Sequence, residues 1–577
     1  MKTFFKWLAG VFTALILFVL VIFLIIMAII DTEPEIRDNS YVAIQLSGSL
    51  PEYIPPDPLS DALTPPPMDL KKVRDVLEKA SVDDRINGVV LEIGFLQTGF
   101  GTLQELTHLI QHFKESGKPI YAYLDTEITF TADYYVASAC DSVFMPPSSN
   151  LFITGVSSEV TFYKDFFKKI GVEAEFLHVG QYKNAPDTYT RSDMSDAHRL
   201  VLNNLLDQYY TEILATIAEN RGIQYKTVEK IVNKQAGMTG NEASLNGLVD
   251  ANLFLSDIED KLKSKNRHPH RLSASDYAII PASSLKIRNK SRIDVIHVSG
   301  MIASGSNSDD PVLGQMAGSG SIVNYLERSA QSSVTKAIVL RIDSPGGSAG
   351  ASEQIWEAIR KAAKKKPVIA SISDYGASGA YYIAMAADSI IATKSSLVGS
   401  IGIFAGKFNI SGLYEKLGLH SEAIKRGRHA DIFSLKKSWT REDKKIIKNL
   451  ITDFYKDFVA KVADSRQLSF EEAEALAQGR VWTGAEAEGN DLIDAHGFFY
   501  TAVEAAKQKA GITDDTSVRL VYYPREKSLF SSMFKAAQAQ ITLINDIKTL
   551  NVERVEKSIH RLQNKPMALL PFQLDWQ

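Results

Sequence analysis

The length, composition and charge of the chain exclude several classes of protein. Of 577 residues, 45% are hydrophobic and 23% are charged, with a mean hydropathy of −0.08, which excludes a disordered, collagen-like or polytopic membrane protein. The formal charge of −4 provides no basic field for nucleic acid. The single cysteine, Cys140, excludes an intrachain disulfide framework and a cysteine zinc cluster, and we expect it to be a small buried side chain.

The first predicted element is a membrane-spanning helix. Residues 7–30 contain no charged side chain, and a helix of that length can cross a hydrocarbon layer of about 30 Å. Lys2 and Lys6 precede this run, and Asp31 and Glu33 follow it, so the positive-inside rule predicts a cytoplasmic N-terminus and a body outside the cytoplasm. A cleaved signal peptide is the alternative, but its apolar core would be shorter and a site with small residues should follow. We therefore expect an uncleaved, single-pass anchor.

The rest of the chain is predicted to be a tandem duplication of one α/β domain. Runs of β-branched residues alternate with amphipathic helical patterns, which is typical of α/β units. VAIQLSGSL at 42–50 resembles DVIHVSGMI at 294–302, and GVVLEI at 88–93 resembles AIVLRI at 337–342. The offset falls only from 252 (42 to 294) to 244 (Thr239 to Thr483) along the match. Because the register is held over this length, chance similarity is excluded.

The repeat divides the chain into five parts. They are a cytoplasmic tip and anchor at 1–33, a first copy at 34–265, a linker at 266–290, a second copy at 291–510 and a C-terminal extension at 511–577. Each copy is expected to run strand, helix, strand, helix, strand, and then to form a long helix, over 196–222 or 441–466. The apolar spacing beyond residue 523 predicts that the extension is partly helical, packed on the body or on a membrane or partner.

The two copies differ at a turn that follows a predicted strand. The second copy has Asp-Ser-Pro-Gly-Gly-Ser at 343–348, where the N–H groups of Gly346 and Gly347 can point into a cleft and stabilise an oxyanion. The first copy has Gly-Phe-Leu-Gln-Thr-Gly at 94–99. A tight turn without a ligand is the alternative, and the Gly-Lys-Ser/Thr sequence of a phosphate-binding P-loop does not follow.

A serine lies at a second turn of the second copy. Ser378 follows the apolar run 367–373 and is flanked by Ala377 and Gly379. This placement resembles a nucleophile elbow, although the pattern is G-x-S-G and not G-x-S-x-G. The alternative is a helix start built of small residues. The first copy has Thr131 at the equivalent position.

A serine nucleophile needs a base, and the sequence offers three candidates. His429 lies nearest in register, while His297 lies in an apolar strand and is expected to be a core residue. Lys183 lies in GQYKNAPD at 180–187, and a buried lysine there would lose its charge near neutral pH and could accept a proton; a surface lysine is the alternative. The second copy has Ala430 at that position. Because one copy has the lysine and the other has the serine and the glycine pair, we predict a site formed between the copies.

These residues resemble a known family. DSPGG, GASGAYYIA, SLVGSIGI and GQYKNAPD, together with the anchor, are similar to the long, duplicated form of signal peptide peptidase A, also called protease IV, over residues 1–510. The resemblance implies a ClpP/crotonase-like fold and a membrane-anchored serine endopeptidase with a Ser/Lys dyad, acting through an acyl-enzyme without metal or other cofactor. The implied residues are Ser378 as nucleophile, Lys183 as general base, Ser400 as the residue that orients the lysine, and Gly346, Gly347 and Gly379 as oxyanion donors.

The resemblance also implies partners and a location. The substrates would be remnant signal peptides, the assembly a homotetramer, and the location a bacterial inner membrane that residues 7–30 cross, with the catalytic body in the periplasm. Two alternatives remain, a crotonase-type acyl-CoA enzyme and an inactive membrane scaffold, and neither needs Ser378. The sequence does not say whether Lys183 meets Ser378 of its own chain or of a neighbour.

Overall fold

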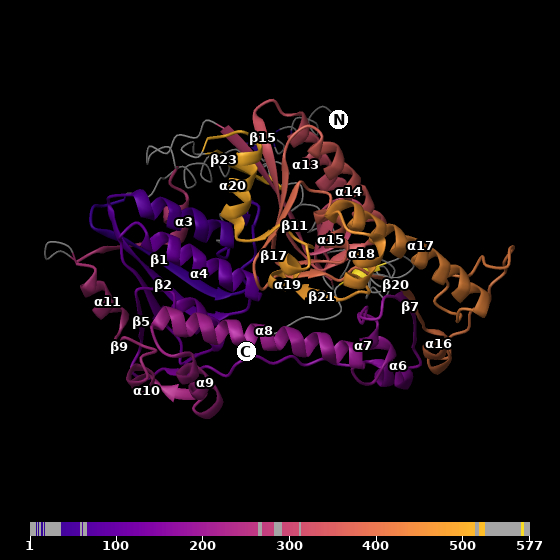
Figure 1. Ribbon diagram of the computed structural model, residues 1–577, viewed down its shortest axis with the longest axis horizontal. Coiled ribbons are helices and arrows are strands. Elements are labelled where there is room, and N and C mark those ends of the chain that lie inside the picture. Colours follow the sequence, from indigo (N-terminus) through magenta and orange to yellow (C-terminus); the bar gives the residue numbers. More distant parts are fainter. Residues whose placement is uncertain are drawn as a thin grey trace.

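Figure 1 shows the computed structural model of the chain. It describes residues 36–57, 60–61, 66–263, 268–281, 291–310, 313–513, 518–525 and 567–569, and five residues between positions 7 and 17. Within these ranges, no helix is long and apolar enough to cross a bilayer. The predicted anchor lies almost entirely outside the described residues.

Two parallel sheets form the centres of the two copies. The first has the order β10-β1-β2-β3-β5-β9 and the second contains β23-β11-β15-β17-β18-β22, with every one of these pairs parallel. The first set is β1 (Ser40–Gly48), β2 (Ile86–Leu96), β3 (Ile120–Leu124), β5 (Ser142–Met145), β9 (Ala251–Asn252) and β10 (His270–Ser273). The second set is β11 (Ser291–Ser299), β15 (Thr335–Ser344), β17 (Val368–Ala377), β18 (Ser389–Ala392), β22 (Ala495–His496) and β23 (Val518–Tyr523). The shared order confirms the predicted α/β duplication.

Helices cover these sheets in equivalent pairs (Figure 1). In chain order the pairs are α3 (Leu70–Val82) and α13 (Ser319–Gln331), α4 (Phe100–Lys114) and α14 (Ala349–Ala363), α5 (Thr131–Ala137) and α15 (Gly379–Ala384), α8 (Asp196–Arg221) and α17 (Arg441–Arg466), α9 (Tyr225–Lys234) and α18 (Phe470–Leu476), α10 (Gly240–Leu245) and α19 (Gly484–Gly489), and α11 (Leu255–Lys261) and α20 (Phe499–Lys509). The long helices α8 and α17 lie where the sequence predicted them. Each begins at a capping side chain, Ser195 or Thr440, that accepts a backbone N–H of the first turn.

Each sheet ends with a strand that lies beyond the predicted end of its copy. Strand β10, inside the range predicted as a linker, pairs with β1, and β23, inside the predicted extension, pairs with β11 in the same way. Each copy therefore takes its edge strand from the segment that follows it. The helix predicted beyond residue 523 lies outside the described part of the chain.

A mixed sheet joins the two copies. Its order is β13-β14-β12-β16-β24-β20-β7, with β7 (Glu173–Val179), β12 (Met301–Ala303), β13 (Ser308–Asp310), β14 (Gly314–Gly318), β16 (Gly346–Ser348), β20 (Ile403–Asn409) and β24 (Met567–Leu569). Strand β7 comes from the first copy and pairs antiparallel with β20 along its whole length. It lies with α6 (Lys164–Ile170), α7 (Asp187–Thr190) and α16 (Ser411–Lys416) on the second copy's side in Figure 1. The pairing carries the loop after β7 to the second copy.

Short strands complete each copy. In the first copy, β4 (Ile128–Thr129), β6 (Asn150–Phe152) and β8 (Gly237–Thr239) form a separate sheet. In the second copy, β19 (Leu397–Gly399) pairs with the end of β17 and with β21 (Val481–Thr483). This arrangement brings the turns after β17, β19 and before β21 to one place.

A buried ionic cluster lies between the copies. Arg341 of β15 is 1% exposed and donates to both carboxylate oxygens of Glu52, at 2.9 and 2.7 Å. It also donates to Glu105, which accepts a further bond from Arg74 at 2.9 Å. Burial alone would raise the pKa of Glu52, but the charge and hydrogen bonds of Arg341 lower it to about 2. Because removal of one partner would leave a buried charge uncompensated, the cluster ties the two copies together.

Candidate active site

Lys183 and Ser378, from different copies, meet at the mixed sheet. The Nζ of Lys183 lies 2.7 Å from the Oγ of Ser378, and 3.0 Å from both the carbonyl oxygen and the Oγ of Ser400. All three residues are fully buried. The structure thus brings the predicted lysine and serine together within one chain.

Ser378 lies at a sharp turn between β17 and α15. Its backbone angles are φ 59° and ψ −114°, a conformation that costs a residue with a side chain about 1–3 kcal/mol. The turn is held because the N–H of Ser378 donates to the oxygen of Gly399 at 2.7 Å and its carbonyl accepts the N–H of Tyr382 at 2.8 Å. These bonds fix the direction of the hydroxyl, as a strand-to-helix turn does in a nucleophile elbow.

A turn at 478–480 holds both Lys183 and Ser400. The carbonyl of Gln478 accepts the N–H of Tyr182, and the carbonyl of Arg480 accepts the N–H of Ser400, each at 2.7 Å. Gly479 lies between them, and a Cβ there would lie 2.6 Å from the backbone nitrogen of Lys183. The turn therefore packs directly on the lysine.

The sequence analysis missed this turn, although the repeat contains a signal for it. The offset of 244 residues that aligns Thr239 with Thr483 places Gln235 of the first copy opposite Gly479. A glycine present in one copy and absent from the other marks a place where only one copy needs a close approach.

Burial lowers the pKa of Lys183 well below its ordinary value, because a charged ammonium is penalised where water is excluded. A neutral amine has two N–H bonds and one lone pair. The carbonyl and hydroxyl oxygens of Ser400 can accept the two N–H bonds, which leaves the lone pair for the O–H of Ser378. This arrangement is that of a base that can take a proton from the serine.

The glycine pair lies in β16, directly after β15. Gly346 has φ 101°, and a Cβ on Gly347 would lie 2.1 Å from the carbonyl oxygen of Ile302 in β12, so a side chain is excluded there. The N–H of Gly346 donates to the Oγ of Ser344 at 3.2 Å. Gly379 is the first residue of α15, where backbone N–H groups have no partner within the helix.

Neither candidate histidine partners Ser378. The Nδ1 of His429 lies 2.6 Å from a carboxylate oxygen of Asp443, in the first turn of α17. His297 is buried in β11, where its ring stacks on Tyr53 at 4.9 Å and burial lowers its pKa to about 3. Cys140 is buried.

The first copy also supports the strand that carries Ser378. Asp374 accepts hydrogen bonds from the backbone N–H and the hydroxyl of Thr102, both at 2.7 Å. Thr102 lies in the first turn of α4, whose N-cap residue, Gly99, has no side chain. A Cβ on Gly99 would lie 2.1 Å from the carboxylate carbon of Asp374. The second copy thus supplies the N-terminal cap of a first-copy helix.

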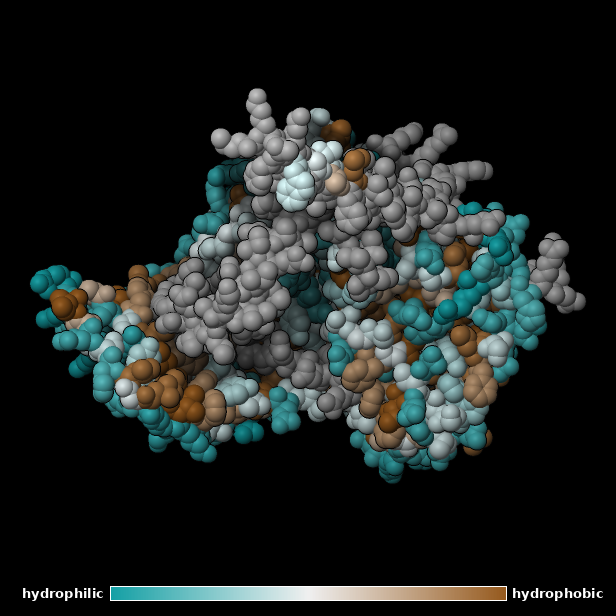
Figure 2. Space-filling view, turned by 180° about the vertical axis from the view of Figure 1, so that it is seen from behind, coloured by the Kyte–Doolittle hydropathy of each residue, from teal (hydrophilic) through white to brown (hydrophobic). Residues whose placement is uncertain are grey.

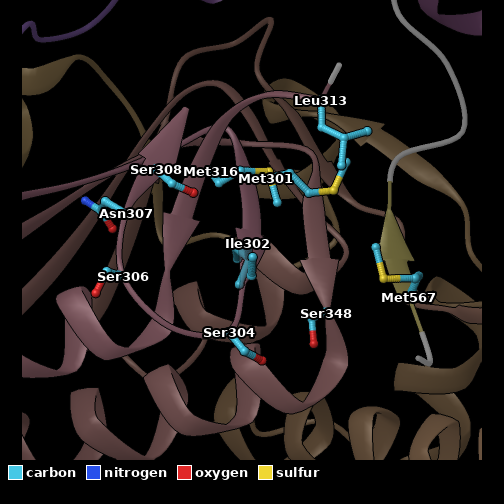
Figure 3. A pocket seen from close by; sticks show the side chains of 11 residues that line it. Met301, Ile302, Ser304, Ser306, Asn307, Ser308, Leu313, Met316, Ser348 and Met567 are labelled. Atoms are coloured by element: carbon cyan, nitrogen blue, oxygen red, sulfur yellow. The ribbon is translucent and has the colours of Figure 1, made fainter. Parts of the chain in front are cut away.

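Two cavities adjoin the glycine pair. One, of about 710 Å³, has walls from both copies, among them Tyr163, Tyr189, Pro345 and Phe404. The other, of about 400 Å³ (Figure 3), is lined largely by apolar residues and serines, including Met301, Ile302, Met316, Ser348 and Met567. The residues on either side of the glycine pair, Pro345 and Ser348, therefore each line a space that can hold side chains.

Known proteins are similar in sequence to this chain over most of its length. The profile of Peptidase family S49 matches residues 112–268 and 360–513, one range in each copy. The chain is 33% identical to "Serine protease SPPA, chloroplastic" of Arabidopsis thaliana over 471 residues, which cover 79% of this chain and 68% of that protein. It is 30% identical to "Protease 4" of Haemophilus influenzae over 458 residues (77% and 73%) and 31% identical to "Putative signal peptide peptidase SppA" of Enterococcus faecium over 211 residues (36% and 60%). The family predicted from the motifs is confirmed, and the chain belongs to peptidase family S49.

Proposed function

We propose that the chain is a serine endopeptidase that cleaves peptides, in particular remnant signal peptides, with Ser378 as nucleophile and Lys183 as general base. The observation that carries the proposal is the 2.7 Å contact between a buried amine and a buried serine hydroxyl. The names of the relatives, a serine protease and a signal peptide peptidase, support peptides as the substrate class.

Proton transfer between Lys183 and Ser378 is central to this mechanism. Neutral Lys183 accepts the proton of Ser378 while the Oγ attacks the carbonyl carbon of the peptide. Ser400 orients the amine by accepting its N–H bonds. The ammonium then protonates the leaving amine, and a water, deprotonated by the same lysine, hydrolyses the acyl-enzyme. Burial serves this cycle because it keeps the resting lysine neutral.

The negative charge that develops on the carbonyl oxygen needs donors, and we assign them to the N–H groups of Gly346, Gly347 and Gly379. The first two lie in β16 and the third begins α15, so they approach Ser378 from two elements. The bond from the N–H of Gly346 to Ser344 is long, at 3.2 Å. An oxyanion is a stronger acceptor than a hydroxyl, and it would replace Ser344 as the partner of this group.

Labelling with a fluorophosphonate tests the proposal. We expect one label for each chain, on Ser378, and no label on Ser378→Ala or Lys183→Ala. We expect Ser400→Ala to react more slowly without losing all reactivity, because it orients the base and does not replace it. Both alternatives, the acyl-CoA enzyme and the inactive scaffold, predict no labelling, so a folded wild-type chain that stays unlabelled would refute the proposal.

Membrane attachment belongs to the same proposal. Residues 7–30 would anchor the chain in a bacterial inner membrane, with the N-terminus in the cytoplasm and the body in the periplasm. A reporter fused after residue 40 should then be active only outside the cytoplasm. Recovery of a soluble form that begins near Asp31 from undisturbed cells would contradict this part of the proposal.

A homotetramer is the proposed assembly. Large apolar side chains are exposed on α6 and in the segment after α16, among them Phe166, Leu417 and Ile424. Figure 2 shows hydrophobic areas at this end of the molecule, which lies on the left in that view. Exposed apolar groups of this kind are typical of contact surfaces between subunits. Light scattering of the detergent-solubilised protein should give the mass of four chains, and Leu417→Asp should lower it.

A further inference from the structure

Strand β24 fills a gap between two strands of the second copy. On one side Met567, Ala568 and Leu569 pair antiparallel with residues 346–348 of β16, so that Leu569 lies opposite Gly346. On the other side Met567 pairs antiparallel with Phe404 of β20. Neighbouring strands lie about 4.8 Å apart. Without β24, therefore, β16 and β20 would present two unpaired edges about 10 Å apart. This gap is two strand spacings wide and has room for one strand.

This gap leads to the proposed catalytic groups. Strand β16 consists of Gly346, Gly347 and Ser348, two of which are proposed oxyanion donors. Strand β20 begins three residues after Ser400. Strand β24 also contacts α15, the helix that begins directly after Ser378. An extended peptide that pairs with both edges would therefore pass the nucleophile.

The side chain of Met567 adds an apolar contact to the main-chain pairing. Met567 is 3% exposed and forms part of the wall of the 400 Å³ cavity, together with Met301 and Met316. Figure 3 shows Met567 on its own strand beside the strand that carries Ser348. Burying a methionine side chain contributes about 1.5–3 kcal/mol, so this strand is held by more than its backbone.

The sequence around β24 restricts how far it can pair. Pro566 and Pro571 bracket the segment Met-Ala-Leu-Leu. Proline has no N–H to donate and favours an extended conformation in the residue before it. The pairing is therefore confined to a few residues, which a longer peptide can displace.

We propose that residues 567–569 are an internal competitor that occupies the peptide-binding gap of the protein's own active site. The inference rests on the proposed function, because it takes the gap between β16 and β20 as the place of the substrate. Since the competitor is covalently attached, its occupancy does not depend on protein concentration. The substrates that displace it are extended peptides with apolar side chains, long enough to pair with both strands.

Peptide binding to the full-length Ser378→Ala chain tests this inference. Ala568→Pro removes an N–H from the middle of β24, and Gln573→Pro, outside β24, is the matched control. The probe is a fluorescein-labelled peptide with the sequence of residues 565–572, followed by fluorescence anisotropy. We expect it to bind the Ala568→Pro chain at least about tenfold more tightly than the control. A chain that ends at Lys565 should behave like Ala568→Pro.

Equal affinity in all these chains, or no binding to any of them, would overturn the inference. In the active enzyme, Ala568→Pro should lower KM for a chromogenic peptide ester and leave kcat unchanged, because it removes a competitor and not a catalytic group. Fluorophosphonate labelling of Ser378 separates the two proposals. A labelled enzyme whose peptide affinity ignores β24 refutes only this inference, whereas an unlabelled one refutes the proposed function.

Discussion

Directly after β15, in β16, the second copy has Gly346 and Gly347, whereas the equivalent turn of the first copy, after β2, has Gln97 and Thr98. The difference changes what the backbone can do. In the first copy, the N–H of Gln97 donates to the carbonyl of Gly48 at 2.8 Å and is used within the fold. In the second copy, the N–H of Gly346 makes a long bond of 3.2 Å to the hydroxyl of Ser344, and Gly346 also lies opposite Leu569 in the pairing of β16 with β24. The same sheet thus supports a closed turn in one copy and a turn that can accept a ligand in the other.

The loop after β7 shows the reverse difference. The first copy has buried Lys183 there, and the second copy has Ala430, beside the half-buried His429 that pairs with Asp443. Each copy keeps the half of the site that the other has lost. Duplication has therefore divided one set of groups between two domains, and substitutions at equivalent residues of the two copies test this division.

The largest effect is expected at the proton-transfer pair. Ser378→Ala, Lys183→Ala and Lys183→Arg should each lower kcat/KM by at least about 10³-fold, since a guanidinium stays charged and cannot act as base. The matched change in the first copy, Thr131→Ala, should leave activity within about twofold. Hydrolysis of a chromogenic peptide ester measures both, with circular dichroism and sizing as folding controls. Near-normal turnover of Lys183→Arg would reopen a Ser/His mechanism.

The glycine pair should come next. In Gly347→Ala, the new methyl group would collide with the carbonyl oxygen of Ile302, 2.1 Å away, and displace β16. We expect kcat to fall by about 10²–10³-fold, the usual effect of losing an oxyanion donor. Thr98→Ala, at the equivalent place in the first copy, should leave kcat unchanged. If both changes had the same effect on single-turnover acylation, the turns would not differ in role.

A smaller effect is expected at the turn that packs on the lysine. Gly479→Ala would place a methyl group 2.6 Å from the backbone nitrogen of Lys183 and shift the amine. A displacement of about 1 Å can cost up to about 10²-fold in rate, so kcat should fall while KM stays near normal. Gln235→Ala, its counterpart in the first copy, is the control. A raised KM with a normal kcat would instead show that the turn acts in substrate binding.

The smallest effect concerns stability and its pH dependence. The pKa of Lys183 is lowered in the folded chain and returns to about 10.4 on unfolding. Unfolding therefore takes up a proton at pH values between the two, and each unit of difference costs the fold about 1.4 kcal/mol. Lys183→Met should raise the midpoint of thermal unfolding near neutral pH, and the gain should shrink as the pH rises toward 10.4.

Lys407 provides the matched control for this stability measurement. It is also fully buried, but its Nζ donates to three backbone carbonyl oxygens, those of Ile432, Ser434 and Lys437, at 3.2, 2.8 and 2.6 Å. Lys407→Met leaves these acceptors without a donor and should destabilise the protein by about 1–3 kcal/mol. A stabilising Lys407→Met, or a destabilising Lys183→Met, would show that the bonds to these carbonyl groups do not distinguish the two lysines.

Repeats and local patterns predicted much of this molecule from sequence. The internal offset identified the duplication, the long helices and the division of residues between copies, because equivalent positions of one fold keep their spacing. The contact between Lys183 and Ser378 followed only from comparing the copies and from the family resemblance. The distance between them along the chain carries no signal of its own.

What the sequence could not predict depends on contacts between distant segments. The edge strands β10 and β23 were assigned to a linker and an extension, because a short exposed strand has no strong periodicity. The capping of α4 by Asp374, the packing of Gly479 on Lys183, and the place of β24 beside β16 each join segments far apart in the chain. Such contacts are fixed by packing and not by local pattern.

The ionic cluster between the copies also has a consequence for the order in which the chain folds. The first copy leaves the ribosome with Glu52, Glu105 and Arg74, two buried anions and one cation, and their neutralising partner, Arg341, lies more than two hundred residues downstream. Until that residue arrives, closing the first copy would bury an excess negative charge. We therefore expect the first copy to close fully only after Arg341 has been made, so that the two halves reach their native packing together and Lys183 becomes buried only when Ser378 is present.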